Sequence, residues 1–330
     1  MTALIIVFGF VFLLLGAEGL VDGASGLAKR FGISNLVIGM TVVAFGTSMP
    51  EFVVNMLSVA EGQTDLALTN IVGSNIINIF VILGLTALVY PIASARSARV
   101  FDIPMNILAG VVVLVAVLVT LPFESVPGMS RLSGGILLLI FGIFMYHSVK
   151  TAKADTSPQK VLWMSTGHPI GQSPSLTKER GLLVNIVYIV LGLAGLIVGG
   201  EMIVRGSVRV ATELGVPDAI IGLTIVALGT SLPELATSVV AATKHNCDLA
   251  LGNIIGSVSF NVFFILGTSA LLRPLPAYEG IILDGIMATL GAVLVWLGII
   301  SNRQHQLKRW HGVLLLTVYA AYLTYRLMNL

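Results

Sequence analysis

The stretch GTSMPE at residues 46–51 places a proline and a carboxylate inside an otherwise apolar run, and it returns as GTSLPE at residues 229–234. Glu234 follows Glu51 by 183 positions, and the same offset pairs Asn78 with Asn261. This register holds without a gap from about residue 16 to about residue 84. The chain is therefore an internal duplication, and each copy carries an acid that the surrounding apolar residues do not explain.

The composition predicts a membrane protein. Of the 330 residues, 56% are hydrophobic and 10% are charged, and the mean hydropathy is +0.98. An ordinary soluble domain is about 25% charged, so this chain has too little polar surface to cover itself in water. The net charge of +2 gives no indication of a nucleic-acid partner, and none is expected. The single cysteine, Cys247, excludes an internal disulfide and a multi-cysteine metal site.

Apolar stretches long enough to cross a bilayer recur about ten times, which predicts an all-α integral membrane protein. They cover residues 3–25, 34–60, 66–90, 103–122, 132–149, 183–204, 217–242, 249–271, 280–300 and 310–328. The first is not expected to be a cleaved signal peptide, because it lacks a basic start and carries Glu18 and Asp22 near its end.

The duplication divides the chain into a first five-helix repeat at residues 1–150, a linker at residues 151–182 and a second five-helix repeat at residues 183–330. Because five is odd, the second copy enters the membrane from the opposite face, as in inverted-repeat transporters. With the N-terminus outside, 13 Lys and Arg residues fall on the inside and 5 on the outside. The positive-inside rule therefore predicts that both termini are outside and that the linker is cytoplasmic, in a cell (inner or plasma) membrane. Residues 161–164 of the linker are open to two interpretations, a small folded element or a surface-lying segment.

The repeated residues suit a cation site. Pro50 and Pro233 lack an N–H and should open their helices, and exposed carbonyls at membrane depth must face protein or a wet cavity. Each buried carboxylate costs about 2.5–3.5 kcal/mol on insertion scales, and either one Ca²⁺ or several Na⁺ would neutralise the pair. Spacings of three and four residues place further oxygens on the same helix faces. The predicted site comprises the side chains of Thr47, Ser48, Glu51, Ser74 and Asn78, and of Thr230, Ser231, Glu234, Ser257 and Asn261.

Other polar residues receive more ordinary interpretations. Asn70 and Asn253 are expected to cap the starts of helices. Glu18 and Glu201 are expected to be interfacial or paired with basic side chains, and Asp22, which matches Arg205 in the second copy, is expected to be peripheral.

GTSMPE followed by GSNIIN, and GTSLPE followed by GSVSFN, resemble the two alpha-repeats of prokaryotic sodium/calcium exchangers in the cation/calcium antiporter superfamily. The resemblance implies ten helices, with the ion sites on the second, third, seventh and eighth. It implies Ca²⁺ between the two glutamates, Na⁺ sites around it, and backbone ligands at Ala44 and Ala227. It also implies that the first and sixth helices slide against the rest. Asn261 departs from members that carry aspartate there, which makes potassium co-transport less expected.

The main hypothesis is a secondary antiporter that exchanges Na⁺ for Ca²⁺ by alternating access, and the alternative is a proton/cation exchanger. An intramembrane hydrolase is disfavoured, because no H-E-x-x-H motif occurs and no histidine lies at membrane depth near Ser48 or Ser231. A passive channel is disfavoured because binding residues on interrupted helices suit alternating access. No enzyme activity and no cofactor are expected. The expected partners are Na⁺, Ca²⁺ and the lipid bilayer; the oligomeric state is open, and a monomer suffices.

Overall fold

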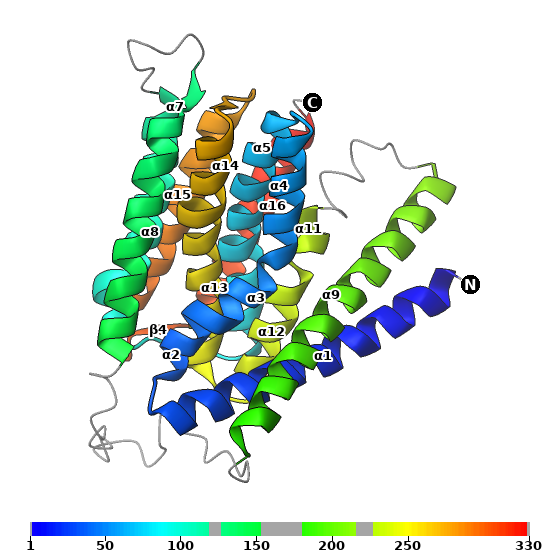
Figure 1. Ribbon diagram of the computed structural model, residues 1–330, viewed down its shortest axis with the longest axis vertical. Helices are drawn as coiled ribbons and strands as arrows, with labels where there is room; N and C mark the ends of the chain where they lie inside the picture. The colour runs from blue at the N-terminus through cyan, green and yellow to red at the C-terminus, as the bar shows by residue number, and fades with distance from the viewer. Residues whose placement is uncertain (1, 119–126, 153–179, 216–226, 329–330) are drawn as a thin grey trace.

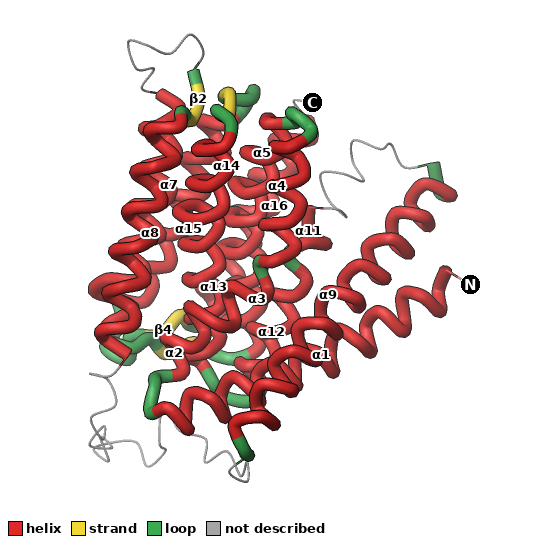
Figure 2. The backbone as a smooth tube through the Cα atoms, viewed as in Figure 1, coloured by secondary structure: helices red, strands yellow, loops and turns green. Residues whose placement is uncertain are grey.

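The computed structural model describes residues 2–118, 127–152, 180–215 and 227–328, and within them the chain forms a bundle of long helices (Figures 1 and 2). Most of the expected linker, including residues 161–164, lies outside the described residues.

The helices of the first repeat follow the predicted stretches, and two of those stretches are built from several consecutive short segments. Ser34 starts the second stretch by accepting a hydrogen bond from the Val37 amide at 3.3 Å, as an N-cap serine does. The elements are α1 (Thr2–Phe31), α2 (Asn35–Ile38), η1 (Gly39–Val43), α3 (Ala44–Thr47), α4 (Met49–Ala60), α5 (Thr64–Ile76), η2 (Ile77–Ile82), α6 (Leu83–Val89), η3 (Ala98–Asp102), α7 (Ile103–Leu118) and α8 (Arg131–Ala152), where η marks a π-helical turn.

The second repeat follows the same order where it is described. Part of the expected stretch 217–242 lies outside the described residues, and the remainder is helical. The elements are α9 (Leu182–Glu213), α11 (Ala227–Thr230), α12 (Leu232–Thr243), α13 (Cys247–Ser259), η5 (Phe260–Leu266), α14 (Gly267–Leu272), α15 (Ile281–Ile300) and α16 (Arg309–Met328).

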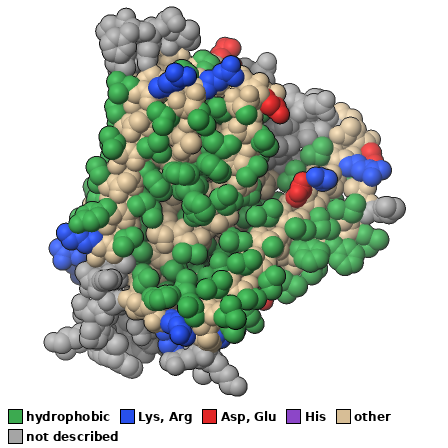
Figure 3. All heavy atoms as spheres, viewed as in Figure 1, with side chains coloured by type: hydrophobic (Ala, Val, Ile, Leu, Met, Phe, Trp, Pro, Cys, Tyr) green, Lys and Arg blue, Asp and Glu red, His purple; other side chains and the backbone are tan. Residues whose placement is uncertain are grey.

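Seven helical spans in the described residues are long and apolar enough to cross a membrane, and the bent pair Asn35–Thr47 and Met49–Ala60 makes a possible eighth. These spans agree with the prediction of a multi-pass membrane protein, while the total of ten spans stays a prediction. Figure 3 shows hydrophobic side chains over the middle of the molecule and Lys and Arg gathered toward its two ends. Leu15, Leu139 and Leu191 are each more than 60% exposed, as lipid-facing side chains should be.

The prediction of a purely helical chain needs a small correction, because two short antiparallel strand pairs connect the halves. Strand β1 (Ile92–Ala93) pairs with β4 (Gln306–Leu307), and β2 (Gly128–Met129) pairs with β3 (Leu275–Pro276). They lie toward opposite ends of the bundle (Figure 2). The backbone N–H and C=O groups of these loops hydrogen-bond to a loop of the other repeat. The helical periodicity of the sequence does not reveal such pairing.

Helices α1 and α9 lie side by side and run obliquely away from the rest of the bundle (Figure 1). Glycines bring their backbones into contact: a Cβ at Gly16 would lie 2.8 Å from the Gly192 carbonyl oxygen, and one at Gly9 would lie 2.9 Å from that of Gly199. Small residues at a helix interface permit this close approach in membranes. The first helices of the two repeats therefore form one antiparallel pair.

Candidate cation site

The two repeated motifs interrupt their helices at equivalent serines. Ser48 separates α3 from α4, and Ser231 separates α11 from α12; their backbone angles, φ −85° and ψ 9° and φ −91° and ψ 6°, are nearly the same. In the first repeat the two segments meet at a bend of 47°. Pro50 and Pro233 fall in the first turn after each break, where a missing N–H is tolerated. The predicted interruption is thus present in both copies.

Two further irregular turns carry the predicted asparagines. Asn78 is the second residue of the π-helical turn η2, and Asn261 is the second residue of η5. Such turns are rare and are found frequently at functional sites. Both asparagines are fully buried.

The two glutamates are buried at the interface between the repeats and hydrogen-bond across it. Ser48 donates to Glu234 Oε1 at 2.7 Å, and Ser231 donates to Glu51 Oε1 at 3.4 Å. Both carboxyl groups are 0% exposed, and they lie close enough to interact electrostatically. Each copy of the motif therefore supplies the acid for one half of the site and a hydroxyl for the other half.

The remaining predicted residues lie around this core in different ways. Ser257 donates to Glu234 Oε1 at 3.5 Å, and Thr230 hydrogen-bonds to the Glu51 carboxylate. Thr47 donates to the Ala44 carbonyl at 3.3 Å and also approaches the Asn253 amide oxygen at 3.2 Å. Ser74 is buried on α5.

The two predicted backbone ligands lie one helical turn before the breaks. The Ala44 carbonyl also accepts the Ser48 amide at 3.0 Å, so it takes part in helical bonding. Ala227 is the first residue of α11.

Several buried oxygens of the site have no hydrogen-bond partner in the described part of the chain. They are the second carboxylate oxygens of Glu51 and Glu234 and the amide oxygens of Asn78 and Asn261. A buried oxygen without a partner is costly, and a bound cation removes that cost. The described residues contain no cluster of three His, Cys, Asp or Glu side chains, so carboxylate, amide and hydroxyl oxygens would have to hold the ion. Such oxygen ligands suit hard cations such as Na⁺ and Ca²⁺.

The prediction that Asn70 and Asn253 cap helix starts is wrong. Both lie in the middle of their helices, α5 and α13, while Gln63 and Asn246 hold the capping positions. The Asn253 amide nitrogen donates to Ser238 at 2.9 Å and to the Glu234 carbonyl at 3.3 Å. Together with its contact to Thr47, Asn253 connects α13 to both broken helices. The sequence did contain a signal against capping: each asparagine lies inside a long apolar stretch, whereas a capping residue lies at the end of a helix.

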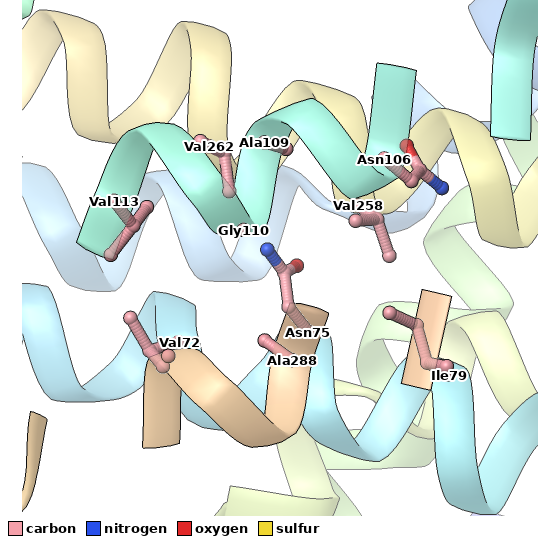
Figure 4. A pocket seen from close by; sticks show the side chains of 11 residues that line it. Val72, Asn75, Ile79, Asn106, Ala109, Gly110, Val113, Val258, Val262 and Ala288 are labelled. Atoms are coloured by element: carbon pink, nitrogen blue, oxygen red, sulfur yellow. The ribbon is translucent and has the colours of Figure 1, made fainter. Parts of the chain in front are cut away.

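Two other residues near the site were not predicted. The Asn75 amide oxygen accepts a hydrogen bond from Asn261 at 3.1 Å, which fixes the orientation of the predicted ligand. Figure 4 shows Asn75 pointing toward Gly110 in a small cavity whose other lining residues, apart from Asn106, are aliphatic or glycine. Thr237, one turn after Glu234, has a fully buried hydroxyl without a hydrogen-bond partner in the described residues.

A family model described as sodium/calcium exchanger protein matches residues 1–150 and 184–328 of this chain. The chain belongs to the sodium/calcium exchanger family. It is 32% identical to the sodium/calcium exchanger MaX1 of Methanosarcina acetivorans, over 97% of each chain. It is also 38% identical to the putative antiporter CaxA of Alkalimonas amylolytica, over 82% of this chain and 80% of that one.

Solved exchanger structures have the same fold. A structure of the sodium-calcium exchanger NCX_Mj, soaked with 10 mM Na⁺ and zero Ca²⁺, superposes with a TM-score of 0.81 at 28% identity and covers 98% of both chains. The exchanger family and these relatives are transporters rather than enzymes. The chain is therefore a transmembrane antiporter of the cation/calcium class.

Proposed function

We propose that this chain exchanges Na⁺ for Ca²⁺ at a single central site built around Glu51 and Glu234. The observation that carries the proposal is the crossed arrangement of these acids, each buried and bonded to a serine of the opposite repeat. Their combined charge of −2 is matched by one Ca²⁺ or by two Na⁺. Because the same oxygens would bind either Ca²⁺ or Na⁺, the two ions compete for one site. This competition couples the movement of one ion to that of the other.

The proposed ligands are the twelve residues predicted from the sequence. The unpartnered oxygens of Glu51, Glu234, Asn78 and Asn261 support the innermost positions. The hydroxyl groups of Ser48, Ser231, Thr230 and Ser257, already in contact with the carboxylates, would turn their lone pairs to the ion. Ser74, Thr47 and the carbonyls of Ala44 and Ala227 complete the proposed set.

The proposed topology has ten spans in two inverted repeats, at residues 1–150 and 183–330, with both termini outside. To test it, Cys247 is replaced by serine and single cysteines are placed at Thr2 or within the 151–182 linker. An impermeant maleimide added to intact cells should label the first and spare the second until the membrane is opened. The reverse pattern would show that the orientation is inverted.

Isotope flux in proteoliposomes tests the exchange itself. ⁴⁵Ca²⁺ uptake is measured with an outward gradient of Na⁺, K⁺ or H⁺ imposed singly. We expect an outward Na⁺ gradient to drive uptake and an equal K⁺ gradient to have no effect. Uptake that follows the pH gradient and ignores Na⁺ would instead establish the alternative, a proton/cation exchanger, which the two buried like-charged carboxylates could also support.

A further inference from the structure

The turn between α12 and α13 fastens the predicted cytoplasmic end of α1 to the bundle. Lys244 Nζ lies 2.5 Å from Asp22 Oδ1, and the Asn246 amide nitrogen donates to Ser25 Oγ at 2.9 Å. Asp22 is therefore not simply peripheral, as its mismatch with the second repeat suggested. Its ion pair with Lys244 is one of the contacts that tie the α1–α9 pair to the helices that carry the site.

Arg180 also contacts Asp22, but it does not tie the pair to the bundle. Its guanidinium lies 3.5 Å from Asp22 Oδ2 and over the ring of Tyr188, a residue of α9. Because Arg180 lies two residues before the start of α9, this ion pair lies within the α1–α9 pair and can survive a movement of that pair as a unit. Lys244 supplies the ion pair that such a movement would have to break.

The internal duplication gives this ion pair a counterpart of reversed charge. At the offset of 183, Asp22 corresponds to Arg205 on α9, and Lys244 corresponds to Glu61 in the turn between α4 and α5. The two turns also match in backbone conformation: His245, which follows Lys244, has φ 58°, and Gly62, which follows Glu61, has φ 82°. The charge at each position is reversed between the two pairs, so each pair still contains one positive and one negative side chain that attract each other.

The counterpart ion pair is not made in this structure. Arg205 binds Glu201 on its own helix at 2.5 Å, with side chains 78% and 56% exposed. Glu61 has no ion pair among the described residues. In this structure the Asp22–Lys244 ion pair is formed, which we call closed, and the Arg205–Glu61 pair is not formed, which we call open.

We propose that Asp22–Lys244 and Arg205–Glu61 are alternating latches, the first closed in the conformation described here and the second closed when the site faces the other side. In an inverted repeat the opposite-facing state arises when the halves exchange conformations, so each contact of one half is replaced by its counterpart. The proposal rests on the alternating access of the proposed function. Partly exposed ion pairs are weak, which suits a contact that must open in every cycle.

Cysteine cross-linking of the full-length protein tests the latches directly. In a Cys247→Ala background, Asp22→Cys with Lys244→Cys and Glu61→Cys with Arg205→Cys are each reconstituted and oxidised. We expect both pairs to cross-link, each to lower ⁴⁵Ca²⁺ flux at least tenfold, and a reductant to restore it. The control, Glu61→Cys with Glu213→Cys, should not cross-link, because residue 213 lies two turns beyond residue 205 on α9.

A charge variant tests whether the ion pair sets the balance between the states. Lys244→Glu repels Asp22 and should speed cross-linking of the Glu61→Cys/Arg205→Cys pair at least threefold. Adding Asp22→Lys together with Arg180→Gln, which removes the cation beside residue 22, restores the attraction with reversed sign and should return the rate to that of an Arg180→Gln parent. Arg209→Gln, which breaks an exposed ion pair with Glu213 on the same helix, should leave the rate unchanged.

The outcomes separate the latches from the proposed function. The latch proposal is overturned if the Glu61→Cys/Arg205→Cys variant transports Ca²⁺ but does not cross-link on oxidation, while the Asp22→Cys/Lys244→Cys variant does cross-link. An unchanged rate in Lys244→Glu would overturn it as well. Flux coupled to H⁺ in place of Na⁺, with both pairs cross-linking as expected, would overturn the proposed exchange and support the latches.

Discussion

At the scale of single residues, the site depends on side chains that bind across the repeat boundary. Ser48 contacts Glu234 and Ser231 contacts Glu51, so neither repeat holds its own acid by itself. Each serine lies at the break in its helix, where the chain turns toward the other repeat. A cation that lies between these two acids, as proposed, would be held only while both halves are in place.

Neutralising either acid should abolish calcium transport. Glu51→Gln and Glu234→Gln keep the shape of the side chain and remove one charge, so a dication would face a site of half the original charge. We expect ⁴⁵Ca²⁺ flux in proteoliposomes to fall at least 100-fold in both variants with normal yield and monodispersity. Glu18→Gln, which changes an exposed acid on α1, should transport normally. Near-normal flux in Glu51→Gln or Glu234→Gln would remove that acid from the site.

Replacing Asn253 should lower both the stability of the protein and its affinity for Ca²⁺, although this residue lies in an apolar helix. Asn253→Ala leaves Ser238 and Thr47 without their shared partner, and an unsatisfied buried polar group costs about 1–3 kcal/mol. We expect a lower Tm in detergent and a weaker apparent affinity for Ca²⁺. The counterpart, Asn70→Ala, loses one bond of 3.4 Å to Asn55 and should be milder. Equal effects of the two substitutions would mean that Asn253 has no special connecting role.

At the scale of elements, helix breaks and glycine contacts decide which parts of the molecule are tied together. The segments around Ser48 and Ser231 belong to the central bundle, whereas α1 and α9 pack on each other through their glycines. The antiparallel contact brings backbone against backbone, which leaves no room for a side chain.

A methyl group in this contact should be destabilising. In Gly16→Ala the new Cβ would meet the Leu196 amide nitrogen at 2.7 Å and the Gly192 carbonyl oxygen at 2.8 Å, both backbone atoms. Overpacking of this kind costs about 1–3 kcal/mol, so a lower Tm and reduced flux are expected. Gly135→Ala on α8 has open space around it, and alanine favours helix, so its Tm should be equal or higher. A Tm for Gly16→Ala that matches Gly135→Ala would show that α1 and α9 separate easily.

At the scale of the whole molecule, a cation held by both repeats should stabilise the fold. A ligand that binds only the folded state contributes about 2.7 kcal/mol at 100 times its Kd. Thermal unfolding in detergent should therefore shift upward with added Ca²⁺ and return after a chelator. Glu51→Gln and Glu234→Gln should lose the shift, while Glu18→Gln keeps it. A shift of the same size in all three variants would place the stabilising Ca²⁺ elsewhere.

The sequence alone determined the features that are local or repeated. The apolar stretches could be found from the sequence because a helix that crosses a bilayer needs a long run of apolar residues. The duplication singled out Glu51 and Glu234 as candidate ligands, because burying an acid in an apolar helix is costly and its repetition is informative. The breaks beside Pro50 and Pro233 followed from the missing N–H group.

Only the tertiary structure decided which polar groups meet. Asn253 and Asn75 lie on long helices whose periodicity gives the face of each side chain but not its partner on another helix. The two repeats share a pattern of residues, yet Asp22 is tied to Lys244 while Arg205 is separate from Glu61. That asymmetry is a property of one conformation, and two nearly equal copies of a sequence carry no information about which copy is closed.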